Sequence, residues 1–344
     1  MKIFISIASY RDPLLGWTIW NCWENAKNKE NLVFGVVEQE LDEFALDLDQ
    51  ECLKDIKDQI RYVKIHPKDS KGACWARAEV QKLYQDEEYY LQIDSHIGFK
   101  PDWDVELTNG MLELEKYHEK PIITGYTQSL ELLKSPSRVP DENKVELADN
   151  PPYTILCMKV VLVPEEVDQT FLTKGGYKLQ IDSKFVDHFK PFCPAFLISG
   201  GFILAKKEFV HEIPYDSEIF FQGEEQTLAI RAFTKGFQMF HMMDAPLRHL
   251  YHNKFGDTEY RPLFWSEEEE YEHRETWTLI EKKSFVRIRD LYLNQIDDTP
   301  YGLGSVRTME EYAELTGVDY INGYIHPKAF HGNNIFGKDY RKPL

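Results

Sequence analysis

The sequence predicts an α/β protein with a mostly parallel, Rossmann-like sheet, helices on both faces and a C-terminal helical extension. Over the first 126 residues, short apolar runs of strand length alternate with polar, helix-like stretches. Such alternation is typical of a parallel sheet whose two faces are covered by helices. A charged amphipathic pattern that begins at Ser266 predicts the extension. With 344 residues, the chain can bury a large core.

The predicted strands of the first part are five apolar runs: "KIFISIA" (2–8), "NLVFGVV" (31–37), "RYVKIH" (61–66), "EYYLQID" (88–94) and "KPIITGY" (120–126). Between the third and fourth runs, "CWARAEVQKLY" predicts a helix, because Ala76, Val80, Leu83 and Tyr84 share one helical face. Ligands of such sheets bind beyond the carboxyl ends of the strands. Residues 94–96 therefore lie where a ligand is expected.

Residues 127–194 depart from this rhythm and predict an inserted region of loop and strand. It holds a loop rich in Pro, Ser, Asn and Asp, and then the strand-like "YTILCMKVVLV". Such insertions often determine which partner a protein binds. We therefore expect a main domain over residues 1–265, containing the insertion 127–194, and a helical extension over 266–344 that packs on it.

The elements after the insertion are predicted by turn and cap residues. "FLISGGFILAKKEFV" indicates a strand, a Gly-Gly turn and a further strand or helix, and "FQMFHMMDAPLRHLYHN" a strand that runs into a loop with three histidines. "QGEEQTLAIRAFTKG" predicts a helix that Gly236 ends. In "RTMEEYAELTG", Thr308 and Glu311 form a capping box and Gly317 follows the helix.

Composition excludes several classes of function. The formal net charge is −18 and the pI is near 5.1, so bulk nucleic acid and anionic membranes are not expected partners. No apolar run has membrane-spanning length, and the N-terminal residues do not form a signal peptide. The five cysteines are scattered without a C-x-x-C pair, which is typical of reduced thiols. We expect a cytoplasmic protein.

The most specific candidate site is "QIDSH", where Asp94 and His96 are two residues apart at the end of an apolar run. Side chains at i and i+2 of an extended segment project to one side, so both could bind one cation. A mixed oxygen and nitrogen set suits Mn²⁺, Fe²⁺ or Zn²⁺ better than Ca²⁺. Alone, an aspartate at a strand end is more often a turn former. Downstream, "LRHLYHN" offers His249 or His252 as a third ligand.

Other residues are candidates for substrate binding on weaker grounds. Glu224 and Glu225 open a helix after a glycine, where acids are common for electrostatic reasons alone. "SGGF" allows a ligand to approach the backbone at Gly200 and Gly201, although an ordinary turn has the same pattern. The remaining candidates are one aromatic residue that could wall the cleft, Trp103, and five residues next to the predicted strand ends or on a helix: Ser9, Tyr10, Arg11, Arg77 and Ser95.

These motifs together resemble one family. In order along nearly the whole chain, they are "SIASYRDP", "KGACWARAEVQKLY", "YYLQIDSHIGF", "SGGF", "QGEEQTLAIRAFTKGF", "HLYH" and "YGLGSVRTMEEYAELTG". The set resembles the cytosolic glycosyltransferases typified by the enzyme that adds N-acetylglucosamine to hydroxyproline on an F-box-complex subunit. It is similar, more distantly, to the polypeptide N-acetylgalactosaminyltransferases. The resemblance implies a GT-A fold, a UDP-sugar donor, a divalent cation (Mn²⁺ or Mg²⁺) and retention of the anomeric configuration.

The resemblance also implies roles for particular residues. The distant relatives' metal motif and later histidine correspond to Asp94, His96 and His249, with His252 in reserve. Where those relatives carry Gly-Gly-Glu-Asn, this chain has Gln222-Gly223-Glu224-Glu225, so either acid could face the sugar. Arg77 and the turn at Tyr10 and Arg11 are expected to hold uridine or phosphate. The acceptor is expected to be a hydroxyl on a protein or a glycan.

Two other functions are compatible with the same residues. A metal-dependent hydrolase of nucleotide sugars would share the cleft, and a nucleotide-sugar-binding module would have lost catalysis. The pentapeptide "LQIDS" also recurs at Leu179–Ser183, where Lys184 replaces the histidine. We interpret this second copy as coincidental, with Asp182 as a turn or surface carboxylate.

Overall fold

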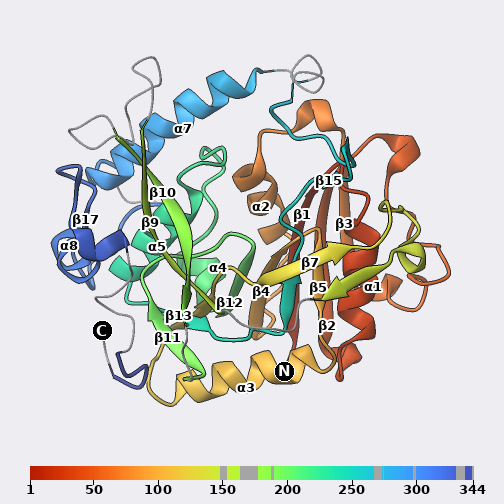
Figure 1. Ribbon diagram of the computed structural model, residues 1–344, viewed down its shortest axis with the longest axis horizontal. Coiled ribbons are helices and arrows are strands. Elements are labelled where there is room, and N and C mark those ends of the chain that lie inside the picture. The colour runs from red at the N-terminus through yellow and green to blue at the C-terminus, as the bar shows by residue number, and fades with distance from the viewer. Residues whose placement is uncertain are drawn as a thin grey trace.

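The structure is a computed structural model, and the eight-stranded sheet at its centre positions everything else (Figure 1). It describes residues 1–147, the backbone of 153–162 and 177–186, and residues 190–266, 273, 275–296, 300–330 and 338–342. The sheet order is β11-β13-β6-β12-β4-β1-β2-β3. Its strands are β1 (Ile3–Tyr10), β2 (Leu32–Gln39), β3 (Ile60–Ile65), β4 (Tyr89–Asp94), β6 (Pro121–Thr124), β11 (Phe192–Ala195), β12 (Phe202–Lys206) and β13 (Gln238–Met242).

Most of this sheet is parallel, as the sequence predicts. β1 pairs in parallel with β2 and β4, β2 with β3, and β6 with β13, whereas β12 is antiparallel to both of its neighbours and β11 to β13. All five predicted runs are confirmed as strands. β12, which follows β4 by more than a hundred residues, separates β4 from β6.

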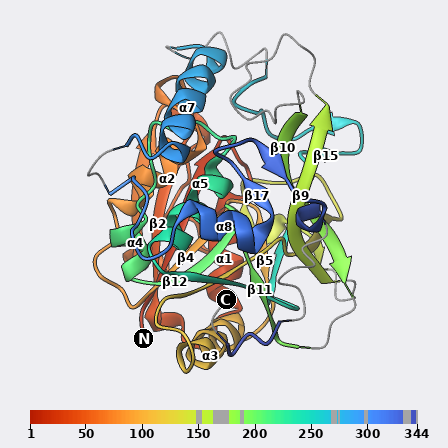
Figure 2. The same cartoon turned by 90° about the vertical axis from the view of Figure 1, so that its left-hand side faces the viewer.

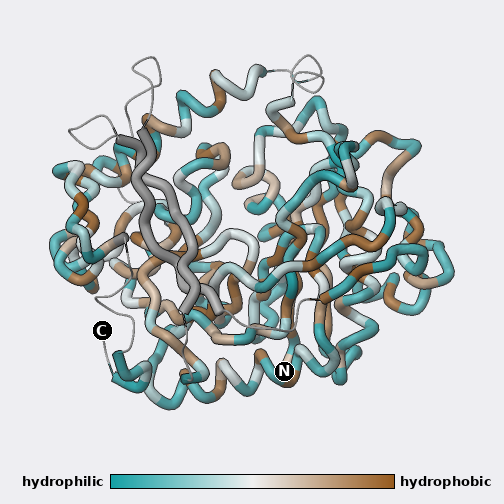
Figure 3. Tube along the Cα trace, in the orientation of Figure 1, coloured by the Kyte–Doolittle hydropathy of each residue, from teal (hydrophilic) through white to brown (hydrophobic). Residues whose placement is uncertain are grey.

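Helices cover both faces of the sheet because its central strands are apolar on both sides. In β1, Phe4 joins one hydrophobic cluster, and Ile3, Ile5 and Ile7 join the other. Hydrophobic residues, in brown in Figure 3, accordingly occur along the central strands. The helices are α1 (Leu15–Glu24), α2 (Ala73–Gln81), α3 (Trp103–Glu115), α4 (Glu208–Glu212), α5 (Glu224–Thr234), α7 (Trp277–Tyr292) and α8 (Met309–Thr316). The first cluster includes residues of α2, α4, α5, α7 and α8, and the second residues of α1 and α3.

A second sheet has four strands. Its order is β5-β14-β7-β8, from β5 (Ile97–Phe99), β14 (Leu247–His249), β7 (Gln128–Leu132) and β8 (Val145–Leu147). The two-stranded pairs are β9 (Tyr153–Leu162) with β10 (Tyr177–Val186), β15 (Lys254–Phe255) with β16 (Thr258–Glu259), and β17 (Val318–Asp319) with β18 (Tyr324–Ile325). β9 coincides with the predicted "YTILCMKVVLV" strand. β10 contains Asp182, opposite Cys157, so of the two expectations for this residue the turn is wrong, and the surface carboxylate stays a prediction.

The C-terminal helices share the main core. Phe285 and Ile288 of α7 and Tyr312 of α8 belong to the same hydrophobic cluster as Leu228 of α5. α7 and α3 lie at opposite ends of the molecule (Figures 1 and 2). The capping box at Thr308 is confirmed, whereas α7 begins at Trp277, and residues 267–272 of the longer predicted helix lie outside the described residues. The domain boundary at 265 stays a prediction.

Short 3₁₀ helices complete the described secondary structure. They are η1 (Lys29–Asn31), η2 (Asp42–Phe44), η3 (Lys57–Gln59), η4 (Pro67–Asp69), η5 (Pro140–Glu142) and η7 (Pro327–Phe330). In the part of the chain that the structure describes, no helix combines the length and the apolar character needed to span a bilayer.

Candidate active site

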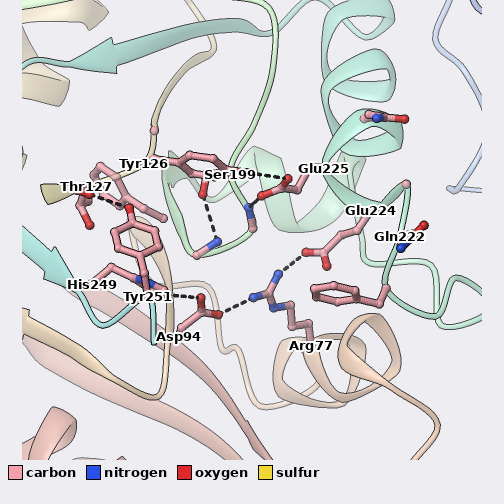
Figure 4. A pocket seen from close by; sticks show the side chains of 17 residues that line it. Arg77, Asp94, Tyr126, Thr127, Ser199, Gln222, Glu224, Glu225, His249 and Tyr251 are labelled. Carbon is pink, nitrogen blue, oxygen red and sulfur yellow. Dashed lines mark hydrogen bonds and ion pairs between the residues drawn. The ribbon is translucent and has the colours of Figure 1, made fainter. Parts of the chain in front are cut away.

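A cavity of about 470 Å³ opens beside the carboxyl end of β4 (Figure 4). Its walls come from α2, β4, the connection after β6, the Gly-Gly turn before β12, the first turn of α5 and the end of β14. The side chains that line it include acids, an arginine, a histidine and aromatic rings: Arg77, Asp94, Tyr126, Glu224, Glu225, His249, Phe221 and Tyr251. This is the position at which an α/β sheet binds its ligands.

Three side chains that can bind a metal lie close together, and two of them, Asp94 and His249, line the cavity. Asp94 ends β4, His96 follows in the turn to β5, and His249 ends β14. One ligand atom from each lies within 4.8 Å of the others. Nε2 of His249 is 3.1 Å from Oδ2 of Asp94. The predicted trio is thus brought together, and the exposed His252 is outside it. Its role as a metal site stays a prediction.

The environment of these three residues fits a cation. Nδ1 of His96 is 2.7 Å from Oδ2 of Asp12, which leaves Nε2 for another partner, and metal-bound histidines commonly have such a carboxylate on the far nitrogen. Burial and Arg261 lower the pKa of His96 to about 4, although Asp12 acts in the opposite direction. His96 is therefore neutral at pH 7, the form that binds metals. Nδ1 of His249 is buried and has no hydrogen-bond partner among the described residues.

Arg77 joins the metal-capable edge to the acidic helix. Its Nη2 donates to Oδ1 of Asp94 at 2.6 Å, and its Nη1 donates to Oε1 of Glu224. Burial alone would raise the pKa of Asp94, but a hydrogen bond from His249 and the charge of Arg77 lower it overall. Asp94 is therefore ionised and able to bind a cation. We expected Arg77 to hold uridine or phosphate, whereas its guanidinium is paired with two carboxylates.

The two acids of α5 differ in their surroundings. Glu224 is 3 % exposed and also accepts a hydrogen bond from the hydroxyl of Tyr215 at 2.8 Å. Glu225 is half-buried and accepts from the Gly200 N–H at 2.8 Å and from the Tyr126 hydroxyl at 3.4 Å. Burial and the charge of Glu224 raise the pKa of Glu225 to about 7, against the effect of the Gly200 hydrogen bond. Glu224 is thus held in a network, and Glu225 can be either protonated or charged near neutral pH.

The Gly-Gly turn is a close approach of backbone to these charged groups. A Cβ at Gly201 would lie 2.7 Å from Oδ2 of Asp94, and a Cβ at Gly200 would overlap Arg77 and Glu224. Both glycines line the cavity. Any side chain at these positions would therefore displace Asp94, Arg77 or Glu224, which is a stronger requirement for glycine than an ordinary turn imposes.

Three predicted substrate-binding residues lie at the end of β1, outside the cavity lining. Ser9 is buried, and its Oγ has no hydrogen-bond partner among the described residues. The Tyr10 hydroxyl is 3.2 Å from Nε2 of His273. Arg11 has a φ of 48° and lies 3.6 Å from the buried Glu40. Left-handed backbone is uncommon for such a residue and occurs often at functional sites. Their role in donor binding stays a prediction.

Two predicted residues do not face the cavity. Trp103 is fully buried in the hydrophobic core, where its ring contacts Phe99 and its Nε1 donates to the carbonyl of Cys22. The expectation that it walls the cleft is wrong, because the first residue of α3 packs inward. Ser95 is buried as well, and its hydroxyl donates to Asp12 at 2.8 Å. Ser95 therefore helps to hold Asp12 in place and is not among the residues that line the cavity.

Several residues that the structure brings to the site carry no recognisable signal in the sequence. Tyr251 donates to the carbonyl of Thr127 at 2.6 Å and contacts the His249 ring at 4.3 Å between centroids. Tyr126 and Phe221 also line the cavity. Asp12 stands in "SIASYRDP", but its neighbour Pro13 made it indistinguishable from a turn former.

Comparisons with known proteins bear on both fold and family. A family model described as Glycosyltransferase (GlcNAc) matches residues 44–322. The crystal structure of GalNAc-T7 with UDP, GalNAc and Mn²⁺ is similar, with a TM-score of 0.51 and 10 % identity over 91 % of this chain. The chain covers 54 % of GalNAc-T7 and so spans about half of it. The likeness shows the fold, and the predicted α/β GT-A architecture is confirmed.

A second solved structure resembles part of the chain. The structure of S. aureus TarS 1–349 in complex with UDP has a TM-score of 0.39 and 9 % identity, and the match covers 70 % of this chain and 60 % of that one. No curated protein matches the chain in sequence.

Proposed function

Because this chain belongs to the Glycosyltransferase (GlcNAc) family, we propose that it transfers N-acetylglucosamine from UDP-GlcNAc to a hydroxyl acceptor, with a divalent cation and with retention of configuration. The observation that carries the proposal is the meeting of Asp94, His96 and His249 at a cavity that Asp94, His249 and Glu225 line. The proposal covers the activity of the whole protein, including the acceptor, which we take to be a hydroxyl on a protein or a glycan. We place it in the cytoplasm, with neither bulk nucleic acid nor a membrane as a partner.

The cation of the proposal is Mn²⁺ or Mg²⁺, held by Asp94, His96 and His249. One carboxylate oxygen and two imidazole nitrogens suit Mn²⁺, Fe²⁺ or Zn²⁺ better than Ca²⁺. When bound, the cation supplies positive charge that stabilises a leaving diphosphate. The GalNAc-T7 structure with UDP, GalNAc and Mn²⁺ supports both the cation and a UDP-sugar donor.

The chain's own residues would orient the sugar and manage charge. Glu225 faces the cavity and can accept hydrogen bonds from sugar hydroxyls while Gly200 and Tyr126 fix its carboxylate. Arg77 keeps Asp94 and Glu224 in place, since it is paired with both. We therefore assign the sugar-facing role to Glu225 and a structural role to Glu224. In a front-face reaction, the acceptor hydroxyl attacks on the face that the phosphate leaves, and a phosphate oxygen takes the acceptor's proton.

Release of UDP from a panel of donors tests the proposal. Purified protein is incubated with UDP-GlcNAc, UDP-GalNAc, UDP-glucose or UDP-galactose, with Mn²⁺, with Mg²⁺ or with EDTA. We expect release from UDP-GlcNAc that requires a cation. Mass spectrometry of a treated lysate then identifies a product carrying the added sugar.

Matched variants locate the reaction. D94A and H96A should abolish cation-dependent release, and D182A should largely preserve it, because the first copy of "LQIDS" ends at the cavity and is followed by His96, whereas the second is followed by Lys184. Full activity in D94A or H96A would contradict the metal assignment. Free GlcNAc formed at a rate that no acceptor extract increases would show a hydrolase. Donor binding in calorimetry without turnover would show a non-catalytic module.

A further inference from the structure

We infer that Asp12, just before α1, is the positioning residue that sets the tautomer and orientation of His96 for metal binding. The inference rests on the proposed function, since it concerns the same metal site. Asp12 is not among the residues that line the cavity. Of the three metal-capable residues, its described contacts reach His96 and neither Asp94 nor His249.

The contacts of Asp12 hold it in one arrangement. Its carboxylate is inaccessible to solvent and has four polar neighbours. Oδ1 accepts from the Leu14 N–H at 2.9 Å. Oδ2 lies 2.8 Å from Oγ of Ser95, 2.7 Å from Nδ1 of His96 and 4.0 Å from Nε of Arg261. A buried carboxylate with this many donors is fixed and charged, because each neighbour stabilises the ionised form.

This carboxylate selects the state of the imidazole. An ionised carboxylate accepts hydrogen bonds and cannot donate them, so the proton of the neutral His96 ring must be on Nδ1. Nε2 then carries the lone pair that a metal needs. A carboxylate on the far nitrogen also makes the imidazole a more basic ligand. Asp12 therefore prepares His96 before any cation arrives.

The first helix fixes the backbone of the same turn. Oγ1 of Thr18 donates to the Ser95 carbonyl at 2.8 Å and accepts from the Ile97 N–H at 3.2 Å. Oδ1 of Asn21 accepts from the Phe99 N–H at 2.8 Å. Thr18 and Asn21 thus hold the main chain on both sides of His96, and Asp12 is the one residue of this group that reaches its ring. Loss of Asp12 would free the ring and leave the backbone in place.

Two substitutions separate this role from a general effect on folding. D12N keeps the shape and removes the charge, so that the amide can donate to Nδ1 and favour the wrong tautomer. D12S keeps an acceptor for the Leu14 N–H, because a serine hydroxyl can accept from the backbone two residues on as an aspartate does, but is too short to reach His96. The matched control is D104N. Asp104 is also buried, and it accepts from the backbone N–H groups of Lys27 and Asn28 at 2.8 and 2.9 Å.

The measurement is Mn²⁺ binding to metal-free protein without nucleotide. Binding is monitored by the decrease in the electron paramagnetic resonance signal of free Mn²⁺. Circular dichroism of each metal-free variant establishes that it is folded. We expect the Kd for Mn²⁺ to rise by about 10- to 100-fold in D12N and D12S, the usual effect of removing the outer partner of a metal ligand. D104N should bind Mn²⁺ as the wild type does, even where it unfolds more easily.

Three results would overturn the inference. Wild-type Mn²⁺ affinity in either folded Asp12 variant would show that His96 needs no positioning by Asp12, and the proposed metal site would stand. An equal loss of affinity in D104N would show an effect of stability alone. A wild-type protein that binds no Mn²⁺ would remove the metal site from the proposed function and this inference with it.

Discussion

The replacement of Arg77 by methionine tests the charged network that joins the two sides of the cavity. Methionine has a similar length and no charge, so R77M leaves the carboxylates of Asp94 and Glu224 without their shared cation. The Arg77 and Glu224 side chains are only 9 % and 4 % exposed, whereas that of Asp94 is 26 % exposed. Removing one partner of a buried ion pair costs about 3–5 kcal/mol. Because one end of this network reaches solvent, we expect about 3 kcal/mol.

Urea unfolding of the metal-free protein, followed by circular dichroism, measures this loss. About 3 kcal/mol is a large part of the 5–15 kcal/mol that stabilises most proteins. Mn²⁺ should restore more stability to R77M than it adds to the wild type, because a bound cation again compensates Asp94. The control is K82M at the C-terminal cap of the same helix, where the 68 % exposed Lys82 pairs with Glu79 and the expected loss is below about 1 kcal/mol. If R77M lost no more than K82M, the network would not stabilise the fold as argued.

Three further predictions concern the turn, the acid and the C-terminal helix. G201A should release UDP at least about tenfold more slowly, because an ångström-scale displacement of Asp94 has effects of this size, and wild-type rates would contradict the steric argument. As pH rises from 5 to 8, the stability of E225Q relative to the wild type, measured by thermal unfolding in EDTA, should increase. The folded-state pKa of Glu225 is near 7, above its ordinary 4.5, so ionisation of this group destabilises the folded wild type. A stability difference that does not change with pH would refute this reasoning. T308A should lose about 1 kcal/mol in urea unfolding with the capping box, and an unchanged midpoint would show that tertiary contacts alone hold α8.

The fold was predictable because its strands are buried on both faces. Runs such as "KIFISIA" have the continuous apolar pattern of that environment, and the helix ends carry local cap residues such as Thr308 and Gly317. The order of strands was not predictable. The antiparallel position of β12 between β4 and β6 depends on pairings between segments far apart in the chain, for which no local pattern exists.

The candidate site was predictable where its chemistry is local. Asp94 and His96 stand two residues apart at the end of a strand, and the structure brings them to His249. Arg77 was expected to hold uridine or phosphate. The sequence does not show that its two acidic partners lie beside it, because they come from other elements of the fold. Trp103 was assigned to the cleft because a sequence does not tell which face of α3 points inward. Asp12 was missed because only the tertiary fold brings the start of α1 to the turn after β4.

The position of β12 also has a consequence for synthesis of the protein. β1 to β4 lie within the first 94 residues and pair in parallel without any later segment. The open edge of β4 gains its partner only when Phe202–Lys206 has left the ribosome. At 5–20 residues per second, that interval lasts about 6–22 s. During it, an apolar strand edge with Leu91 and Ile93 is exposed to other nascent chains. Chaperone binding to ribosome-bound chains of this length should therefore be strongest before residue 206 emerges and decrease once β12 has paired.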